Sequence, residues 1–111
     1  MTTTLRIADF TRYPGGRYKR ISKFSGEEYR DDYLAPALEK KEMVVVVLDG
    51  TVGYGSSFLD ELFGGIVRKM HWRSVSDFDA HISLQSEDRS FITETRQYVA
   101  DAISSNNTVR P

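Results

Sequence analysis

The segment EMVVVVLDGTVGYGSSFLDELFGGIVRK (Glu42 to Lys69) joins a strongly hydrophobic run to a hydrophobic helix pattern through a turn rich in glycine and serine. Met43 to Leu48 are continuously apolar and include four consecutive valines. Such a run predicts a strand that is buried on both faces, as in the centre of a parallel sheet. Phe58 to Met70 repeat apolar side chains at i, i+3 and i+4, which predicts an amphipathic helix. The segment therefore predicts an α/β domain built around one central strand.

The residues before this segment predict an edge of the same sheet. Apolar and polar side chains alternate over residues 4–10, TLRIADF, which is typical of a half-buried strand. Pro14, Gly15 and Gly16 then provide a turn. Residues 17–22, RYKRIS, are predicted to return as a short second strand of a hairpin.

The first helix is predicted from its cap and its internal proline. Ser25 and Glu28 have the spacing of a capping box, in which each residue satisfies the backbone N–H of the other. Pro36 lies inside the helical pattern and predicts a kink or division near Leu34 or Ala35.

The C-terminal part of the chain predicts a strand at residues 81–86 and a helix at about residues 90–104. The element order is then β-(β)-α-β-α-β-α. It predicts a small, mostly parallel sheet of three to four strands, with about three helices chiefly on one side and the hairpin strand as an antiparallel edge. A chain of 111 residues fits one domain, residues 1–111. We expect residues 4–104 to be ordered and residues 105–111 to form a frayed tail.

The turn after the central strand is the candidate functional site. In a parallel α/β unit, the loop after a strand and the start of the next helix lie at the carboxyl edge of the sheet, where ligands and partners usually bind. Gly53 and Gly55 allow backbone angles that other residues avoid and let another surface approach closely. The candidate switch or partner-binding residues here are Gly53, Tyr54, Gly55, Ser56 and Ser57.

Four interpretations of this turn compete. A phosphate-binding loop is disfavoured because the Walker pattern needs a lysine after its last glycine, and GYGSSF has none. A serine hydrolase is disfavoured because GYGSSF lacks the G-x-S-x-G spacing of a nucleophile elbow. A plain helix cap fits Ser57 and Asp60, which would start the helix at Phe58 and leave Ser56 facing outward. The fourth interpretation is that Ser56 is a switch that presents its hydroxyl for modification.

The composition disfavours several other classes of site. The chain has no cysteine, which excludes disulfides and cysteine-based metal sites. Only two histidines occur, and they lack the spacing of metal ligands, so we expect no metal, no cofactor and no catalytic constellation. The net charge is −1, with fifteen basic residues scattered among sixteen acidic ones. This balance provides no broad footprint for nucleic acid or an anionic membrane.

No apolar run approaches the ~20 residues that a membrane span needs. The opening residues also lack the pattern of a signal peptide. We therefore expect a cytoplasmic protein, with neither nucleic acid nor a membrane as its partner. The oligomeric state is not predicted.

Arg17 in the segment PGGR is a secondary candidate for binding an anion, since its guanidinium provides several donors. If residues 17–22 form a hairpin strand, Arg17 lies at the sheet edge opposite Ser56. If the chain runs as one loop into the first helix, Arg17 can converge on Ser56. The alternatives are a surface arginine beside a turn and, for the locally basic RYPGGRYKR, a solvated strand or turn, although a small anion patch there stays open. The mid-helix pair Gly64–Gly65 favours tight packing over a partner surface or hinge.

The hydrophobic strand, short turn, serine pair and amphipathic helix resemble the STAS domain of bacterial anti-sigma factor antagonists. That family usually has Asp-Ser-Ser/Thr-Gly at this junction, and a partner kinase phosphorylates the serine after the aspartate. In this chain Gly55, Ser56, Ser57 and Phe58 take those places. The resemblance therefore implies a switch at Ser56.

The chain is more closely similar to the STAS-like family of uncharacterised, mostly bacterial, proteins. The segments PGGR, FSGEEYRDDYLAPAL and GYGSSFLDELFGGIVR carry this resemblance, which spans about residues 5–103. It implies a non-enzymatic signalling domain that acts beside a histidine-kinase-like ATPase or kinase. We expect such a partner to bind residues 52–57 and the exposed side of the following helix. The alternative is a small-ligand or nucleotide-sensing module that holds an anion at the helix start near Ser56.

Overall fold

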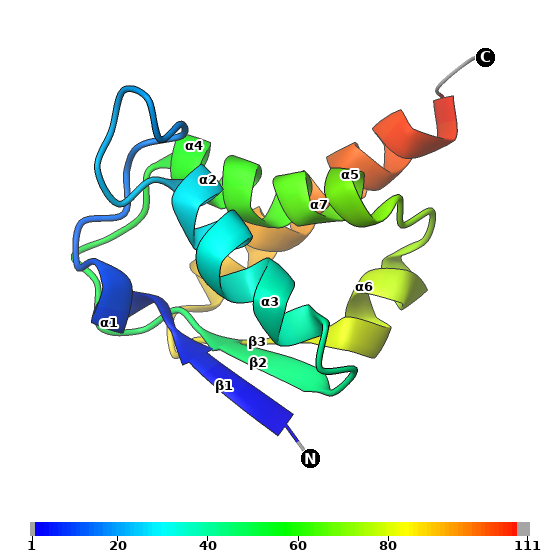
Figure 1. Ribbon diagram of the computed structural model, residues 1–111, viewed down its shortest axis with the longest axis horizontal. Coiled ribbons are helices and arrows are strands. Elements are labelled where there is room, and N and C mark those ends of the chain that lie inside the picture. The colour runs from blue at the N-terminus through cyan, green and yellow to red at the C-terminus, as the bar shows by residue number, and fades with distance from the viewer. Residues whose placement is uncertain (1, 109–111) are drawn as a thin grey trace.

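A computed structural model describes residues 2–108 as a three-stranded sheet with helices on one side of it (Figure 1). The strands are β1 (Thr2–Arg6), β2 (Met43–Val47) and β3 (Ile82–Gln85). They are parallel and lie in the order β1-β2-β3, so the valine-rich β2 is central, as its sequence predicts. The fold is thus a small α/β domain.

Two long helical segments cross over between the strands, and each contains a turn of π-helix. The first segment runs through α2 (Gly26–Tyr29), η1 (Arg30–Leu34) and α3 (Ala35–Leu38). The second runs through α4 (Ser56–Leu59), η2 (Asp60–Gly64) and α5 (Gly65–Met70). The remaining helices are α1 (Ile7–Phe10), α6 (Val75–His81) and α7 (Arg89–Thr108).

Pro36 divides the first helical segment at the predicted place. Proline has no N–H to donate into the helix, so the regular ladder cannot continue through residue 36. The N–H of Ala35 reaches five residues back to the carbonyl of Arg30, which closes the π turn just before the proline.

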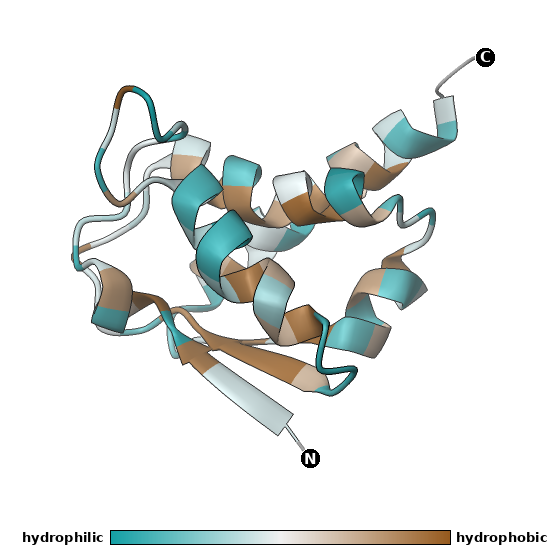
Figure 2. Ribbon diagram, viewed as in Figure 1, coloured by the Kyte–Doolittle hydropathy of each residue, from teal (hydrophilic) through white to brown (hydrophobic). Residues whose placement is uncertain are grey.

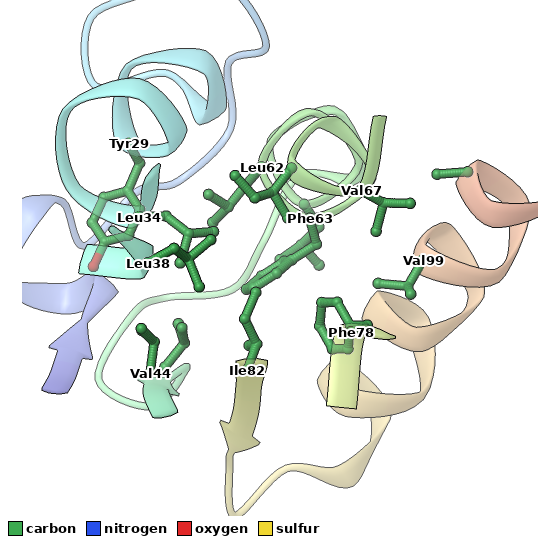
Figure 3. Close-up of a cluster of buried hydrophobic side chains, with 14 of the residues drawn as sticks. Tyr29, Leu34, Leu38, Val44, Leu62, Phe63, Val67, Phe78, Ile82 and Val99 are labelled. Atoms are coloured by element: carbon green, nitrogen blue, oxygen red, sulfur yellow. The ribbon is translucent and has the colours of Figure 1, made fainter. Parts of the chain in front are cut away.

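The hydrophobic core lies between the helices and one face of the sheet, where the hydrophobic parts of the ribbon face each other (Figure 2). Val44 and Val46 point into this core and are fully buried. Figure 3 shows the core side chains Tyr29, Leu34, Leu38, Val44, Leu62, Phe63, Val67, Phe78, Ile82 and Val99.

The other face of the sheet has no helix over it in Figure 1. Met43 and Val45 point to this face and are only half-buried. The prediction that β2 is buried on both faces is therefore wrong for these two residues. A continuous apolar run indicates a central strand but does not tell how many of its faces are covered.

The predicted hairpin is also wrong. Residues 17–22 form no strand, and the described residues contain no antiparallel edge. Backbone groups near residues 17–22 pair with the start of α2 instead, because Gly26 and Glu27 donate their N–H groups to the carbonyls of Gly16 and Arg17. The first strand is shorter than residues 4–10 suggest, since the chain turns into α1 at Ile7, whose side chain is fully buried.

The C-terminal helix is longer than predicted, and α6 was not predicted. The helix α7 continues to Thr108, so residues 105–108 belong to it and are not a frayed tail. Its Asn106 donates to the carbonyls of Val67 and Trp72, which fixes the last turn against the end of α5. The rest of the predicted tail, residues 109–111, lies outside the described residues.

Among the described residues, no helix has the length and apolar character required to cross a membrane.

Candidate functional site

The loop from β2 to α4, residues 48–55 (the β2–α4 loop), lies at the carboxyl edge of the central strand, as predicted. Gly55 is extended, with φ −73° and ψ 139°, and its carbonyl accepts the N–H groups of Phe58 and Leu59. Gly55 is therefore the N-cap, and the helix begins at Ser56. The prediction that Ser57 caps a helix starting at Phe58 is wrong, because Ser57 is already the second helical residue.

The two serines differ in exposure. Ser56 is exposed and Ser57 is half-buried, which agrees with the prediction that Ser56 faces outward. The side chain of Ser56 lies beside the hydroxyl of Tyr98 on α7. That hydroxyl donates to Glu94 Oε2 at 2.7 Å, and this hydrogen bond raises the pKa of Tyr98. Ser56 therefore lies at the surface, where the start of α4 meets α7.

The loop from α1 to α2, residues 11–25 (the α1–α2 loop), packs directly on the β2–α4 loop. The N–H of Gly55 donates to the carbonyl of Pro14 at 2.8 Å, and the N–H of Val52 donates to the carbonyl of Arg12 at 2.9 Å. A Cβ at position 55 would lie 2.9 Å from the carbonyl oxygen of Gly15. The segments PGGR and GYGSS, far apart in sequence, therefore form one surface.

Arg17 converges on the start of the second helical segment, α4–η2–α5 (the central helix), as expected if residues 11–25 form one loop. Its guanidinium donates to Asp60 at 2.8 Å and to Glu61 at 3.4 Å. The hydrogen bond with Asp60 raises the pKa of Arg17, which keeps the guanidinium charged. Two carboxylates therefore already neutralise Arg17, which the sequence suggested as a group for binding an external anion.

Sequence reasoning missed the ion-pair network to which Arg17 belongs. Glu61 is buried and accepts from Arg30 of η1 as well as from Arg17. Arg30 also pairs with Asp31, which in turn pairs with Lys19 of the α1–α2 loop. Burial lowers the pKa of Arg30, but its hydrogen bonds with the two carboxylates outweigh that effect and raise it. The signal in the sequence for this network was Glu61, a charged residue inside the apolar run FLDELFGGIV.

The network joins the two π turns, since Arg30 belongs to η1 and Glu61 to η2. A π turn contains one residue more than an α-helical turn, which changes the direction of the side chains around it. Such turns are frequent at functional sites. Here the two turns bring opposite charges together between neighbouring helices.

Tyr54 and Gly53 have different places in the β2–α4 loop. The hydroxyl of Tyr54 donates to the carbonyl of Leu48 at 2.8 Å, and its ring packs on Phe58 and Phe91. Burial raises the pKa of this hydroxyl. Tyr54 therefore anchors the loop, while Gly53 forms its turn with φ 135°, an angle that favours glycine.

The central helix offers no exposed side over most of its length. Its residues 58–67 are buried except for Asp60, which is half-buried. The exposed part of this helix is limited to Ser56 and residues 68–70, so the predicted partner face on its exposed side is small and stays a prediction. The helix lies between the first helical segment and α7, and its glycines permit this. A Cβ at Gly65 would meet Arg30 of the first segment, and one at Gly64 would lie 3.6 Å from the carbonyl oxygen of Tyr98 on α7. The packing interpretation of Gly64–Gly65 is confirmed.

The chemistry available at this edge is limited. The two histidines lie away from the serines, with His71 after the last turn of α5 and His81 just before β3. Within residues 2–108, no group of three or more His, Cys, Asp or Glu side chains is placed to hold a metal ion.

These features define a small α/β domain in which a serine pair opens the central helix at the carboxyl edge of a parallel sheet. A family model described as a STAS-like domain of unknown function (DUF4325) matches residues 25–88, more than half of the chain. The chain belongs to this STAS-like family. No curated protein and no solved structure gives a significant match.

Proposed function

We propose that this chain is a non-enzymatic regulatory domain that binds an ATPase- or kinase-type protein through the carboxyl edge of its sheet. Membership of a STAS-like family supports the broad class. The contact surface we propose comprises residues 52–57 together with the adjoining α1–α2 loop, and not the buried side of the central helix.

The observation that carries this proposal is the position of Ser56. Its side chain is exposed on the first turn of the central helix, next to a loop whose Val52 is 65% exposed. The backbone bonds from Val52 and Gly55 to the α1–α2 loop hold this surface in one conformation. A pre-organised surface with exposed apolar side chains reduces the entropy lost when a partner binds.

Phosphorylation of Ser56 is the proposed switch. A phosphate adds roughly −1.5 to −2 units of charge and three strong acceptor oxygens. Ser56 and Asp60 are four residues apart and so lie on the same helix face, about one turn from each other. A phosphate on Ser56 would compete with Asp60 for Arg17, and the α1–α2 loop that bears Arg17 would shift. The helix N-terminus favours the added charge.

An enzymatic role has less support, because a serine nucleophile needs a neighbouring base. Neither histidine of the chain lies near the serines. The serines therefore suit modification by another protein better than catalysis.

A second candidate is an anion- or nucleotide-sensing site at the same helix start, favoured by the arrival of Arg17 beside it. We rank it lower since Asp60 and Glu61 already pair with that guanidinium. A thermal-shift screen of nucleotides and phosphorylated metabolites tests it. A ligand at 100 times its Kd should stabilise by about 2.7 kcal/mol, and a panel without shifts removes this candidate.

The test of the leading proposal compares the affinity of the wild type, Ser56→Glu and Ser56→Ala for a candidate ATPase- or kinase-type partner protein. We expect Ser56→Glu to bind at least tenfold more weakly and Ser56→Ala to bind nearly as the wild type. Ser104→Glu adds the same charge at an exposed position of α7 and is the matched control. Equal affinities of Ser56→Glu and the wild type would rule out the switch.

A further inference from the structure

The α1–α2 loop concentrates positive charge that the even overall balance conceals. Its residues include five basic side chains, at positions 12, 17, 19, 20 and 23, and no acidic one. Since the whole chain carries −1, the other residues carry a net charge of −6. Arg17 and Lys19 are paired with Asp60 and Asp31. Arg12, Arg20 and Lys23 form no ion pair among the described residues and are exposed.

The same loop exposes large apolar side chains. Tyr13 is 74% exposed and Ile21 is 69% exposed, and Phe24 and Tyr18 are also exposed. Figure 2 shows that the loop projects from the body of the molecule and carries a hydrophobic segment at its apex between hydrophilic ones. Several exposed apolar side chains on one loop indicate an interaction site more strongly than the same residues scattered over the whole surface.

The loop is held in place at its base. Gly26 and Glu27 of α2 donate to the carbonyls of Gly16 and Arg17, and the N–H of Lys19 donates to Glu27 Oε1. The ring of Phe24 packs edge-on against Phe10, with centroids 5.3 Å apart. The exposed apolar side chains are thus presented by a structured loop.

We propose that the α1–α2 loop docks this domain on an anionic lipid bilayer, with the exposed Ile21 entering the interface and its exposed neighbours Arg20 and Lys23 facing the headgroups. An apolar apex surrounded by cations matches both the apolar boundary and the negative potential of such a surface. The α1–α2 loop is also part of the proposed partner surface, so a bilayer and the protein partner would compete for it.

Two observations favour a bilayer over other anionic partners. Single-stranded nucleic acid stacks its bases on aromatic faces, but the ring of Tyr18 already has the guanidinium groups of Arg17 and Arg20 at 6.0 and 5.9 Å from its centroid. A fluid interface accommodates the projecting loop of Figure 1 without a surface shaped to receive it.

Co-sedimentation of the full chain with sucrose-loaded vesicles tests the proposal. We expect binding to vesicles of phosphatidylcholine mixed with phosphatidylserine, much weaker binding to phosphatidylcholine alone, and release at high salt. Each basic residue near an anionic surface contributes a factor of about five, so the double variant Arg20→Glu/Lys23→Glu should bind at least about 25-fold more weakly. Ile21→Ser, which keeps the charge, should also weaken binding.

The matched control is Lys40→Glu/Lys69→Glu, which changes the net charge equally at exposed positions outside the loop. It should keep most of the binding, and circular-dichroism melts should show that all variants are folded. The proposal is overturned if the wild type does not sediment with the phosphatidylserine vesicles, or if both double variants lose binding equally. Loop-dependent binding to a single-stranded oligonucleotide or to polyglutamate without vesicle binding would also overturn it.

Discussion

A serine side chain caps a helix only when its residue precedes the first helical position, and this decides the roles of the serines in this domain. Ser25 meets the condition, since it is extended and its Oγ accepts the N–H of Glu28 at 3.1 Å. Ser56 and Ser57 do not, because Gly55 occupies the cap. A serine followed by an acidic residue three positions later therefore predicts the cap correctly in one helix and wrongly in the other.

The first prediction separates these serines by stability. Ser25→Ala should lower the free energy of unfolding by about 1 kcal/mol, since it removes the cap of α2. Ser56→Ala and Ser57→Ala should each change it by less than about 0.5 kcal/mol. Urea melts measure all three. A loss of 1 kcal/mol in Ser57→Ala would restore the capping role that the sequence suggests.

Close backbone approach at Gly26 gives the second prediction. A Cβ there would lie 2.5 Å from the carbonyl oxygen of Phe58, on the neighbouring helix. Gly26→Ala should destabilise the domain by about 1–3 kcal/mol, because the two helices must separate. Gly15→Ala is the control, since its Cβ would meet only one atom, at 4.0 Å. Equal melting temperatures for the two variants would contradict the helix contact.

The third prediction concerns acid stability and Asp31. Burial alone would raise the pKa of this carboxyl, but hydrogen bonds from Arg30 and Lys19 outweigh it, and the net pKa is lowered. A lowered pKa in the folded state contributes stability above the unfolded value of about 3.9 and loses it as the pH falls through the folded pKa. Asp31→Asn should therefore lose less stability than the wild type between pH 6 and pH 3. Urea melts over this pH range measure the loss. An equal loss of stability in the two proteins would contradict this linkage.

At the scale of elements, the parts of the fold that depend on local sequence could be predicted. The valine run predicts the central strand, and Pro36 predicts where the first helical segment divides. Both follow from the covalent properties of nearby residues. The sequence also held a signal that the central helix is buried on nearly all sides. Gly64 and Gly65 lie outside its apolar face, and residues without a side chain allow neighbouring helices to pack there.

The parts that could not be predicted depend on contacts between distant segments. Residues 17–22 contain β-prone side chains, but the pairing of Gly16 and Arg17 with the start of α2 makes them part of a loop. The convergence of PGGR on Ser56 depends on that topology, and the pairing of Arg30 with Glu61 depends on two helices meeting. Residues 105–108 look polar and terminal, yet contacts with the α5 end keep them helical.

The fourth prediction tests whether contacts with the end of α5 keep residues 105–108 helical. Asn106 Nδ2 donates to the carbonyls of Val67 and Trp72, at 3.2 and 2.8 Å, and Asn106→Ala leaves both without this partner. It should cost about 1–3 kcal/mol of stability. Asn107→Ala should cost less because Asn107 is exposed. Thermal melts compare the two, and a larger loss in Asn107→Ala would show that Asn106 does not fix the last turn.

At the scale of the whole molecule, the domain has a helical layer on one face of a three-stranded sheet and two interacting loops at its carboxyl edge. The family match covers the central strand, the serine junction and β3, but begins only at residue 25, where the α1–α2 loop ends. The shared part therefore explains the STAS-like fold and the junction. The loop that packs on this junction adds exposed apolar and basic side chains, and the two loops together form the surface to which we assign binding.

Hydrogen–deuterium exchange of the chain, with and without the proposed ATPase- or kinase-type partner, tests the central claim most directly. The α6 region and the end of α7 lie away from the proposed surface and serve as internal references. We predict slower exchange on binding in residues 48–57 and 11–25, and unchanged exchange in residues 71–81 and 104–108. Protection confined to residues 71–81 and 104–108, with none at the serine junction, would contradict the account.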